Sequence, residues 1–189
     1  MHPTVLILAS GLGLRFRKAG GQTHKLQADL AGRPVLERTI EAVRATGLRW
    51  HLEQTFHPGM GETIAAAVRA TRQAAGWLVL PADMPLISPQ TIRQVADAIA
   101  RGAEAAQPVM GGQRGHPVGF AAGNGEILRA MRGDEGARFL LATIRQIGKA
   151  EEIEVDDPGI LEDIDTPADL ERVEALWRAR QARHGGLAD

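Results

Sequence analysis

Cysteine is absent from the 189-residue chain, and this absence excludes disulfides, thiolate metal sites and a cysteine nucleophile. It also fits a reducing compartment. The longest apolar run near the N-terminus, residues 5–9, is too short to span a membrane, and no charged segment precedes it. The net charge of −1 leaves no excess of positive charge for binding nucleic acid. We therefore expect a cytoplasmic protein that binds neither nucleic acid nor a membrane.

Lysine is scarce: only Lys18, Lys25 and Lys149 occur among 22 basic residues, so a lysine at a special position is informative. No internal repeat or low-complexity linker divides the chain. The length fits one domain over residues 1–180, and we expect residues 181–189 to form a frayed tail.

Apolar runs of strand length alternate with segments of helical periodicity. The expected strands are 4–8, 48–56, 77–80, 105–109, 116–121 and 153–155. The expected helices are 33–46, 61–72, 88–99, 126–131, 136–147 and 166–180. This alternation predicts an α/β protein with a mainly parallel sheet, in which ligands bind beyond the carboxyl ends of the strands.

The first candidate site is therefore the glycine-containing segment after Leu8. Its glycines let backbone amides approach an anion closely, and Arg15 adds a donor suited to phosphate. A dinucleotide fingerprint would need glycine where Phe16 stands, and no Gly-Lys-Ser/Thr completes a P-loop. An ordinary strand-to-helix turn remains the alternative. The phosphate-binding candidates are Leu8, Ala9, Ser10, Gly11, Gly13 and Arg15.

Further motifs follow this loop in a fixed order along nearly the whole chain. They are Lys25-Leu26 with Gly32-Arg33-Pro34-Val35-Leu36, Leu80-Pro81-Ala82-Asp83-Met84-Pro85, Gly112-Gln113-Arg114-Gly115-His116-Pro117, Gly133-Asp134-Glu135-Gly136-Ala137-Arg138 and Asp163-Ile164-Asp165-Thr166-Pro167. The set resembles the nucleotidyltransferases that make molybdenum cofactor dinucleotides, and most closely the cytidylyltransferase branch.

The resemblance implies a three-layer α/β/α Rossmann-like fold and a Mg²⁺-dependent reaction. That reaction transfers a nucleoside monophosphate from CTP to molybdopterin and releases pyrophosphate, and a client molybdoenzyme would receive the product. Two alternatives with the same chemistry are guanylyl transfer and another phosphate acceptor, such as a sugar phosphate. An alternative of another class is a non-catalytic protein that binds or delivers the cofactor.

Two departures from the family pattern concern the nucleotide base. Ser10 stands where the cytidylyl branch usually has alanine and the guanylyl branch has glycine. The stretch 47–59 has room for one strand, where the family normally fits two strands and a helix. The sheet is therefore expected to be one strand short on the side that borders the base.

The implied catalytic residues are Arg15, Lys25 and Asp83. Arg15 and Lys25 would hold the triphosphate, although Lys25 has the alternative of a solvated surface lysine. Asp83 follows a buried strand directly, so its carboxylate is a natural Mg²⁺ ligand. Asp165 is the second candidate ligand, with a helix-start role as its alternative. Asp163 is expected to face away, because alternate residues of extended chain point in opposite directions.

The implied acceptor-binding residues are Arg114 and His116. His116 precedes a proline, which favours extended backbone at the histidine. A purely structural histidine is the alternative. The other histidines lack the spacing of metal ligands, and we expect none of them to bind a metal.

Overall fold

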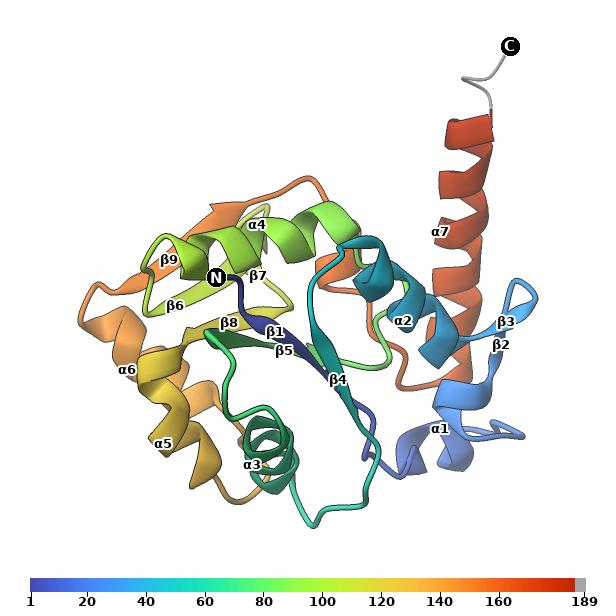
Figure 1. Ribbon diagram of the computed structural model, residues 1–189. Helices are drawn as coiled ribbons and strands as arrows, with labels where there is room; N and C mark the ends of the chain where they lie inside the picture. Colours follow the sequence, from blue (N-terminus) through green and yellow to red (C-terminus); the bar gives the residue numbers. More distant parts are fainter. Residues whose placement is uncertain (186–189) are drawn as a thin grey trace.

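The computed structural model describes residues 1–185, and its centre is a seven-stranded sheet. The strands lie in the order β4–β1–β5–β8–β6–β7, and β9 pairs with β6 outside this path (Figure 1). The strands are β1 (Thr4–Leu8), β4 (Trp50–Glu53), β5 (Gly76–Pro81), β6 (Ala105–Met110), β7 (Gln113–Arg114), β8 (Val118–Ala121) and β9 (Ala150–Glu154).

Five of these strands run in one direction, and only β7 and β8 oppose them. In the parallel part of the sheet, Leu8 at the end of β1 lies beside Glu53 of β4 and Pro81 of β5. The carboxyl ends of three adjacent strands are therefore level. This is the edge at which α/β proteins bind their ligands.

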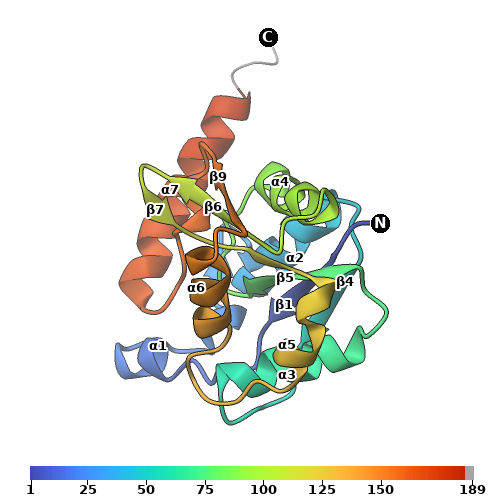
Figure 2. The same ribbon diagram turned by 90° about the vertical axis from the view of Figure 1, so that its left-hand side faces the viewer.

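Helices cover both faces of the sheet, as Figure 2 shows for α4 on one side and α3 and α5 on the other. One face carries α2 (Val35–Ala45), α4 (Pro89–Ala100) and α7 (Pro167–Gly185). The other carries α3 (Met60–Ala70), α5 (Gly125–Arg129) and α6 (Arg138–Gln146). Alternate β1 residues feed the two cores, with Val5 and Ile7 in the first and Leu6 and Leu8 in the second.

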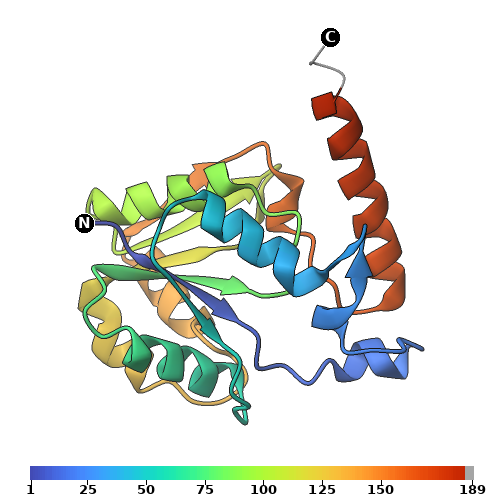
Figure 3. The same cartoon turned by 45° about the vertical axis from the view of Figure 1, so that its right-hand side comes forward.

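Several short elements gather beyond the carboxyl end of β1, beside the start of α7 (Figure 3). They are helix α1 (Leu14–Lys18), the 3₁₀ turn η1 (Lys25–Gln27) and the hairpin of β2 (Asp29–Leu30) and β3 (Arg33–Pro34). A further 3₁₀ turn, η3 (Pro158–Ile160), precedes α7. Neither α1 nor the hairpin was expected from the sequence. Residues 33–34 belong to the hairpin, so α2 begins at Val35 and not at residue 33.

The expected fold class is confirmed: a mixed α/β structure has its mainly parallel sheet between two helical layers. Between α2 and α3 the chain forms only β4, so a single strand occupies this stretch. At the other end, α7 continues to Gly185, beyond the point where we expected a frayed tail to begin. Residues 186–189 of that expected tail lie outside the described residues. No helix in the described part of the chain is long and apolar enough to cross a membrane.

Candidate active site

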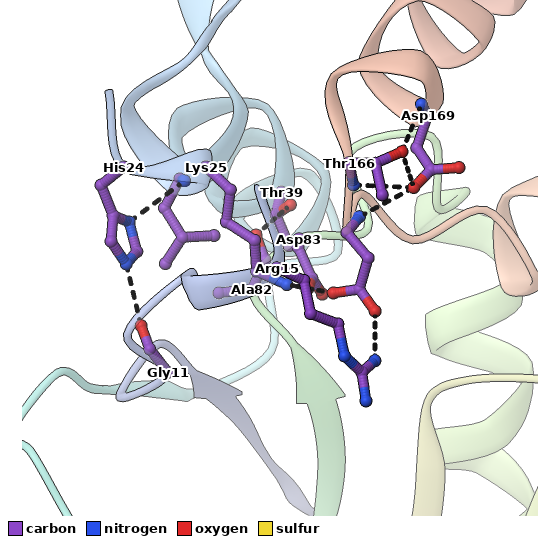
Figure 4. A network of polar contacts seen from close by, with 11 residues as sticks. Gly11, Arg15, His24, Lys25, Thr39, Ala82, Asp83, Thr166 and Asp169 are labelled. Atoms are coloured by element: carbon purple, nitrogen blue, oxygen red, sulfur yellow. Dashed lines mark hydrogen bonds and ion pairs between the residues drawn. The ribbon is translucent and has the colours of Figure 1, made fainter. Parts of the chain in front are cut away.

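The chain after β1 forms a glycine-containing loop, residues 9–13, that leads into α1. Gly13 has a φ of +61°, and a Cβ at this position would lie 3.2 Å from the ring of His24. The Nε2 atom of His24 donates a hydrogen bond of 2.8 Å to the carbonyl oxygen of Gly11 (Figure 4). The loop is thereby fastened to η1, which carries Lys25 into the site.

The loop forms one wall of a cavity of about 450 Å³ at the carboxyl ends of β1 and β5. Both expected metal ligands, Asp83 and Asp165, also line this cavity. So do four apolar side chains that are 41–62% exposed, namely Leu12, Leu14, Phe56 and Met60. The structure thus gathers all the expected nucleotide-binding residues, which are Leu8, Ala9, Ser10, Gly11, Gly13, Arg15 and Lys25.

An ion-pair network crosses the floor of the cavity. The Lys25 Nζ atom lies 2.6 Å from Asp83 Oδ2 and 2.7 Å from Asp165 Oδ1. Arg15 donates a hydrogen bond of 2.8 Å to the other oxygen of Asp165. Figure 4 shows Lys25, Asp83 and Arg15 converging at this point. The Lys25 side chain is only 14% exposed, whereas that of Arg15 is 82% exposed.

These contacts shift the pKa values of the paired groups in opposite directions. Burial acts to lower the pKa of Lys25, but the charges and hydrogen bonds of Asp83 and Asp165 outweigh it and raise the pKa. Burial acts to raise the pKa of Asp165, but Lys25 and Arg15 outweigh it and lower the pKa. The cationic and anionic forms therefore stabilise each other.

Asp83 is held by the backbone around it. The Ala82 amide donates to the Leu8 carbonyl at 3.0 Å, and the Thr39 hydroxyl donates to the Ala82 carbonyl at 2.9 Å. The Ile164 amide donates to the carbonyl of Asp83 at 3.2 Å. The segment that carries Asp83 is thus tied to β1, to α2 and to the chain before α7.

Asp163 is not turned away from the site, and our expectation for it is wrong. One carboxylate oxygen from each of Asp83, Asp163 and Asp165 lies within 4.8 Å of the others. The alternation of side chains along a strand does not apply here, because the chain bends at Asp165. Of residues 163–165, only Ile164 is fully buried, and the two aspartates on either side of it both reach the site. Burial and the nearby charges of Asp83 and Asp165 raise the pKa of Asp163.

The three carboxylates fit a divalent cation chemically. Carboxylate oxygens are preferred ligands of Mg²⁺, which also keeps water and phosphate oxygens. Asp83 Oδ1 is buried without a hydrogen-bond partner, so one ligand atom is already free. Lys25 and Arg15 balance the negative charges of Asp83 and Asp165. The charge of Asp163, the third carboxylate, is left for a further cation to balance.

The helix-start alternative for Asp165 is taken by another residue. Asp169 accepts hydrogen bonds from the Thr166 amide at 2.8 Å and from the Thr166 hydroxyl at 2.8 Å. The Asp169 amide in turn donates to the Thr166 hydroxyl oxygen at 3.2 Å, which completes a capping box for α7. Burial alone would raise the pKa of Asp169, but bonds from Arg172 and Thr166 lower it to about 2. The Asp165 side chain is therefore left to Lys25 and Arg15.

The expected acceptor residues, Arg114 and His116, line a second cavity of about 470 Å³. Leu8, Met60 and Pro81 border both cavities, so the two adjoin at the ends of β1 and β5. Burial lowers the pKa of His116, and its Nδ1 atom is buried without a hydrogen-bond partner. The Nε atom of Arg114 lies 2.6 Å from Glu152 Oε1.

Two further polar residues of the first cavity, Thr63 and His57, were not predicted from the sequence. The hydroxyl oxygens of Ser10 and Thr63 lie 2.7 Å apart. His57 Nε2 lies 3.4 Å from Glu53 Oε1, at the buried end of β4. The only signal for Thr63 was its position near the start of the expected helix 61–72.

Comparison with known proteins decides the family. Residues 41–150 match the model of the MobA-like NTP transferase domain. The chain belongs to this family. The match contains Asp83, Arg114 and His116, and the assignment does not depend on the β1 loop, Lys25 or Asp165.

Two known proteins show what this chain is similar to in sequence and in fold. The purine catabolism protein PucB of Bacillus subtilis is 32% identical over 129 residues, which are 66% of this chain and 62% of PucB. Rv0371c of Mycobacterium tuberculosis has the same fold, with a TM-score of 0.77 at 21% identity over 93% of this chain and 98% of that one. It has also been solved in complex with manganese, with a TM-score of 0.73 at 20% identity over 93% and 99% of the chains.

A second fold relative carries molybdopterin in its name. It is the molybdopterin-guanine dinucleotide biosynthesis protein A of Archaeoglobus fulgidus, with a TM-score of 0.60 at 18% identity. The alignment covers 93% of this chain and 99% of the archaeal one. At this level of identity the likeness extends to the fold alone.

Proposed function

We propose that this protein transfers a cytidine monophosphate unit from CTP to molybdopterin, with Mg²⁺ as the metal ion and pyrophosphate as the second product. The observation that carries the proposal is the pair of adjoining cavities. One holds Lys25, Arg15 and the carboxylates, and the other holds Arg114 and His116. The order of the motifs along the chain supports molybdopterin as the acceptor.

The chemistry requires no nucleophile from the protein. A phosphate oxygen of the acceptor forms the new bond to the α-phosphorus, and the bond from that phosphorus to pyrophosphate breaks. Lys25 and Arg15 bind the triphosphate and stabilise the negative charge that builds up on the leaving group. Asp83 and Asp165 would hold the divalent cation, which would supply further charge neutralisation for the triphosphate.

The acceptor would bind in the second cavity. Arg114 offers a guanidinium group that is suited to an anionic group of the acceptor. His116 lies in the same lining, beside an apolar wall formed by Val79, Val118 and Phe120. A molecule that combines an anionic group with a flat ring matches this lining, and molybdopterin is such a molecule.

CTP is proposed over GTP because of the wall around Ser10. Its hydroxyl is bonded to Thr63 of α3, so this part of the loop is held against a helix. Cytosine is smaller than guanine, and a side chain at this position takes space that a purine would need.

The test is pyrophosphate release with CTP, GTP, ATP and UTP, each with and without molybdopterin. We expect release only when molybdopterin is present, and fastest with CTP. Asp83→Asn serves as the inactive control, and Arg101→Ala, which loses an exposed ion pair with Glu151, serves as the active one.

Each rival function has its own outcome in this assay. Faster release with GTP would assign the guanylyl reaction. Release in a further arm, in which a sugar phosphate takes the place of molybdopterin, would assign a different acceptor. Binding of molybdopterin without any release would assign a binding or delivery protein. The single strand between α2 and α3 is the feature that favours this last outcome.

A further inference from the structure

We propose that Lys25 occupies the cation position between Asp83 and Asp165 until a nucleotide binds, so that a divalent cation enters with the nucleotide and not before it. This inference rests on the proposed metal-dependent reaction. It gives Lys25 two successive partners, first the carboxylates and then the triphosphate.

The contacts of Asp165 carry the first step of the argument. Both of its oxygens are already taken, Oδ1 by Lys25 and Oδ2 by Arg15. The Lys25 Nζ atom also lies 2.6 Å from Asp83 Oδ2. A metal ion that used these two carboxylates would need the space that the ammonium group fills. Lys25 and the free metal ion therefore compete for the same ligands.

Burial decides which of the two basic residues, Lys25 or Arg15, competes more strongly with a metal ion. Lys25 and Asp83 have side chains only 14% and 13% exposed, so water screens their attraction weakly. The Arg15 side chain is 82% exposed, and its pairing with Asp165 is correspondingly weak. The lysine is the larger obstacle to a metal ion that arrives alone.

A bound triphosphate removes this obstacle. The cavity that holds Lys25 is also bordered by the 9–13 loop, where the phosphates are expected. Phosphate oxygens there would give Lys25 and Arg15 new anionic partners and release the oxygens of Asp165. Nucleotide and metal then strengthen each other's binding by the same factor, as linkage requires.

The experiment measures Mn²⁺ binding to the full chain without nucleotide, by calorimetry or by the loss of the free-ion resonance signal. We expect Lys25→Ala to bind Mn²⁺ about ten-fold more tightly than the unmodified protein, the low end of the range for a lost hydrogen bond to a charged group. Arg15→Ala removes the same charge from the same carboxylate, and its gain should be less than about three-fold. Lys149→Ala removes a distant lysine and should change nothing.

Lys25→Gln guards against a folding defect in Lys25→Ala, because it keeps a hydrogen-bond donor near the two carboxylates. It should also bind free Mn²⁺ more tightly than the unmodified protein. Adding CTP should tighten Mn²⁺ binding in the unmodified protein and should do so much less in either lysine variant.

Two results would overturn the inference, and they can be told apart. If free Mn²⁺ binds the lysine variants no more tightly than Arg15→Ala, Lys25 does not occupy the metal position, while the proposed function stands. If no variant binds Mn²⁺ with or without CTP, both the inference and the metal-dependent reaction fail.

Discussion

The hydroxyl groups of Ser10 and Thr63 lie 2.7 Å apart and join the loop after β1 to helix α3. Residue 10 is the position at which this chain departs from both branches of the family it resembles. The bond holds a side chain against the cavity wall where the guanylyl branch has only glycine. The choice of base is therefore open to a direct test.

We predict that CTP binds more tightly than GTP and that Ser10→Gly reduces this preference by admitting the larger base. Competition binding of the two nucleotides measures it. Thr63→Ala is the matched control, because it removes the hydrogen bond but leaves the serine side chain in the chain. Tighter binding of GTP by the unmodified protein would reverse the assignment, and Ser10→Gly should then give GTP no further gain.

Lys25→Ala is predicted to weaken CTP binding by roughly 1.5–3 kcal/mol, the scale of a hydrogen bond to a charged group. Calorimetry at constant Mg²⁺ measures the change. Lys149→Ala is the control, since that side chain is 59% exposed and its Nζ atom makes a long ion pair of 4.0 Å with Glu104 Oε1. An unchanged affinity in Lys25→Ala would remove this residue from the triphosphate site.

The fold and the site differ in how far the sequence predicts them. The strands carry short apolar runs and the long helices carry apolar residues at a regular period, and burial of those residues in two cores fixes the elements and their order. The end of a buried strand then places Asp83 at the ligand edge without further information. Lys25 could be singled out only because it belongs to a motif of the family that the chain resembles, and not from the periodicity of apolar residues.

Asp163 shows where this reasoning stops. Its direction depends on a bend at Asp165 and on the burial of Ile164, neither of which follows from alternation in an extended chain. Helix α1 has five residues and one buried side chain, Phe16, so it leaves no periodic signal. The pairing of Lys25 with two aspartates more than fifty residues away depends on tertiary structure alone.

Asp83→Asn and Asp165→Asn are predicted to lower turnover severely while leaving the protein folded, because charge neutralisation matters most in the transition state. CTP binding should fall only modestly. The two carboxylates lie close enough to share one ion, with oxygens within 4.8 Å. Pyrophosphate release and far-ultraviolet circular dichroism measure activity and fold.

Asp163→Asn is the informative companion variant. It removes the third carboxylate of the cluster without breaking either contact of Lys25. A loss of turnover equal to that of Asp165→Asn would make Asp163 a metal ligand of the same rank. Full activity in Asp165→Asn would contradict the shared site.

Stability should depend on pH through Asp169, whose pKa is lowered to about 2 by Arg172 and Thr166 against the opposing effect of burial. Because the folded pKa lies below the ordinary value of 3.8, the unfolded chain binds more protons in this range. The stabilisation is complete above about pH 4 and is lost as the pH falls towards 2. Chemical denaturation at several pH values gives the free energy of unfolding as a function of pH. This free energy should change less with pH in Asp169→Asn, and an unchanged pH dependence would show that the cap does not stabilise α7.

The last prediction separates acceptor binding from nucleotide binding. Arg114→Ala and His116→Ala should slow pyrophosphate release with molybdopterin and leave CTP affinity unchanged, since both side chains line the second cavity and neither lines the first. Arg101→Ala is matched to Arg114→Ala, because each loses one ion pair between an exposed arginine and a glutamate of β9.

The concentration of molybdopterin tells the two roles apart. If Arg114 binds the acceptor, saturating molybdopterin should restore much of the rate in Arg114→Ala, because the loss is one of affinity. His116 lies deeper, with a buried free Nδ1 atom, and its loss should persist at saturation if the ring orients the attacking group. Equal behaviour of Arg114→Ala and Arg101→Ala would return Arg114 to a structural role in its ion pair with Glu152.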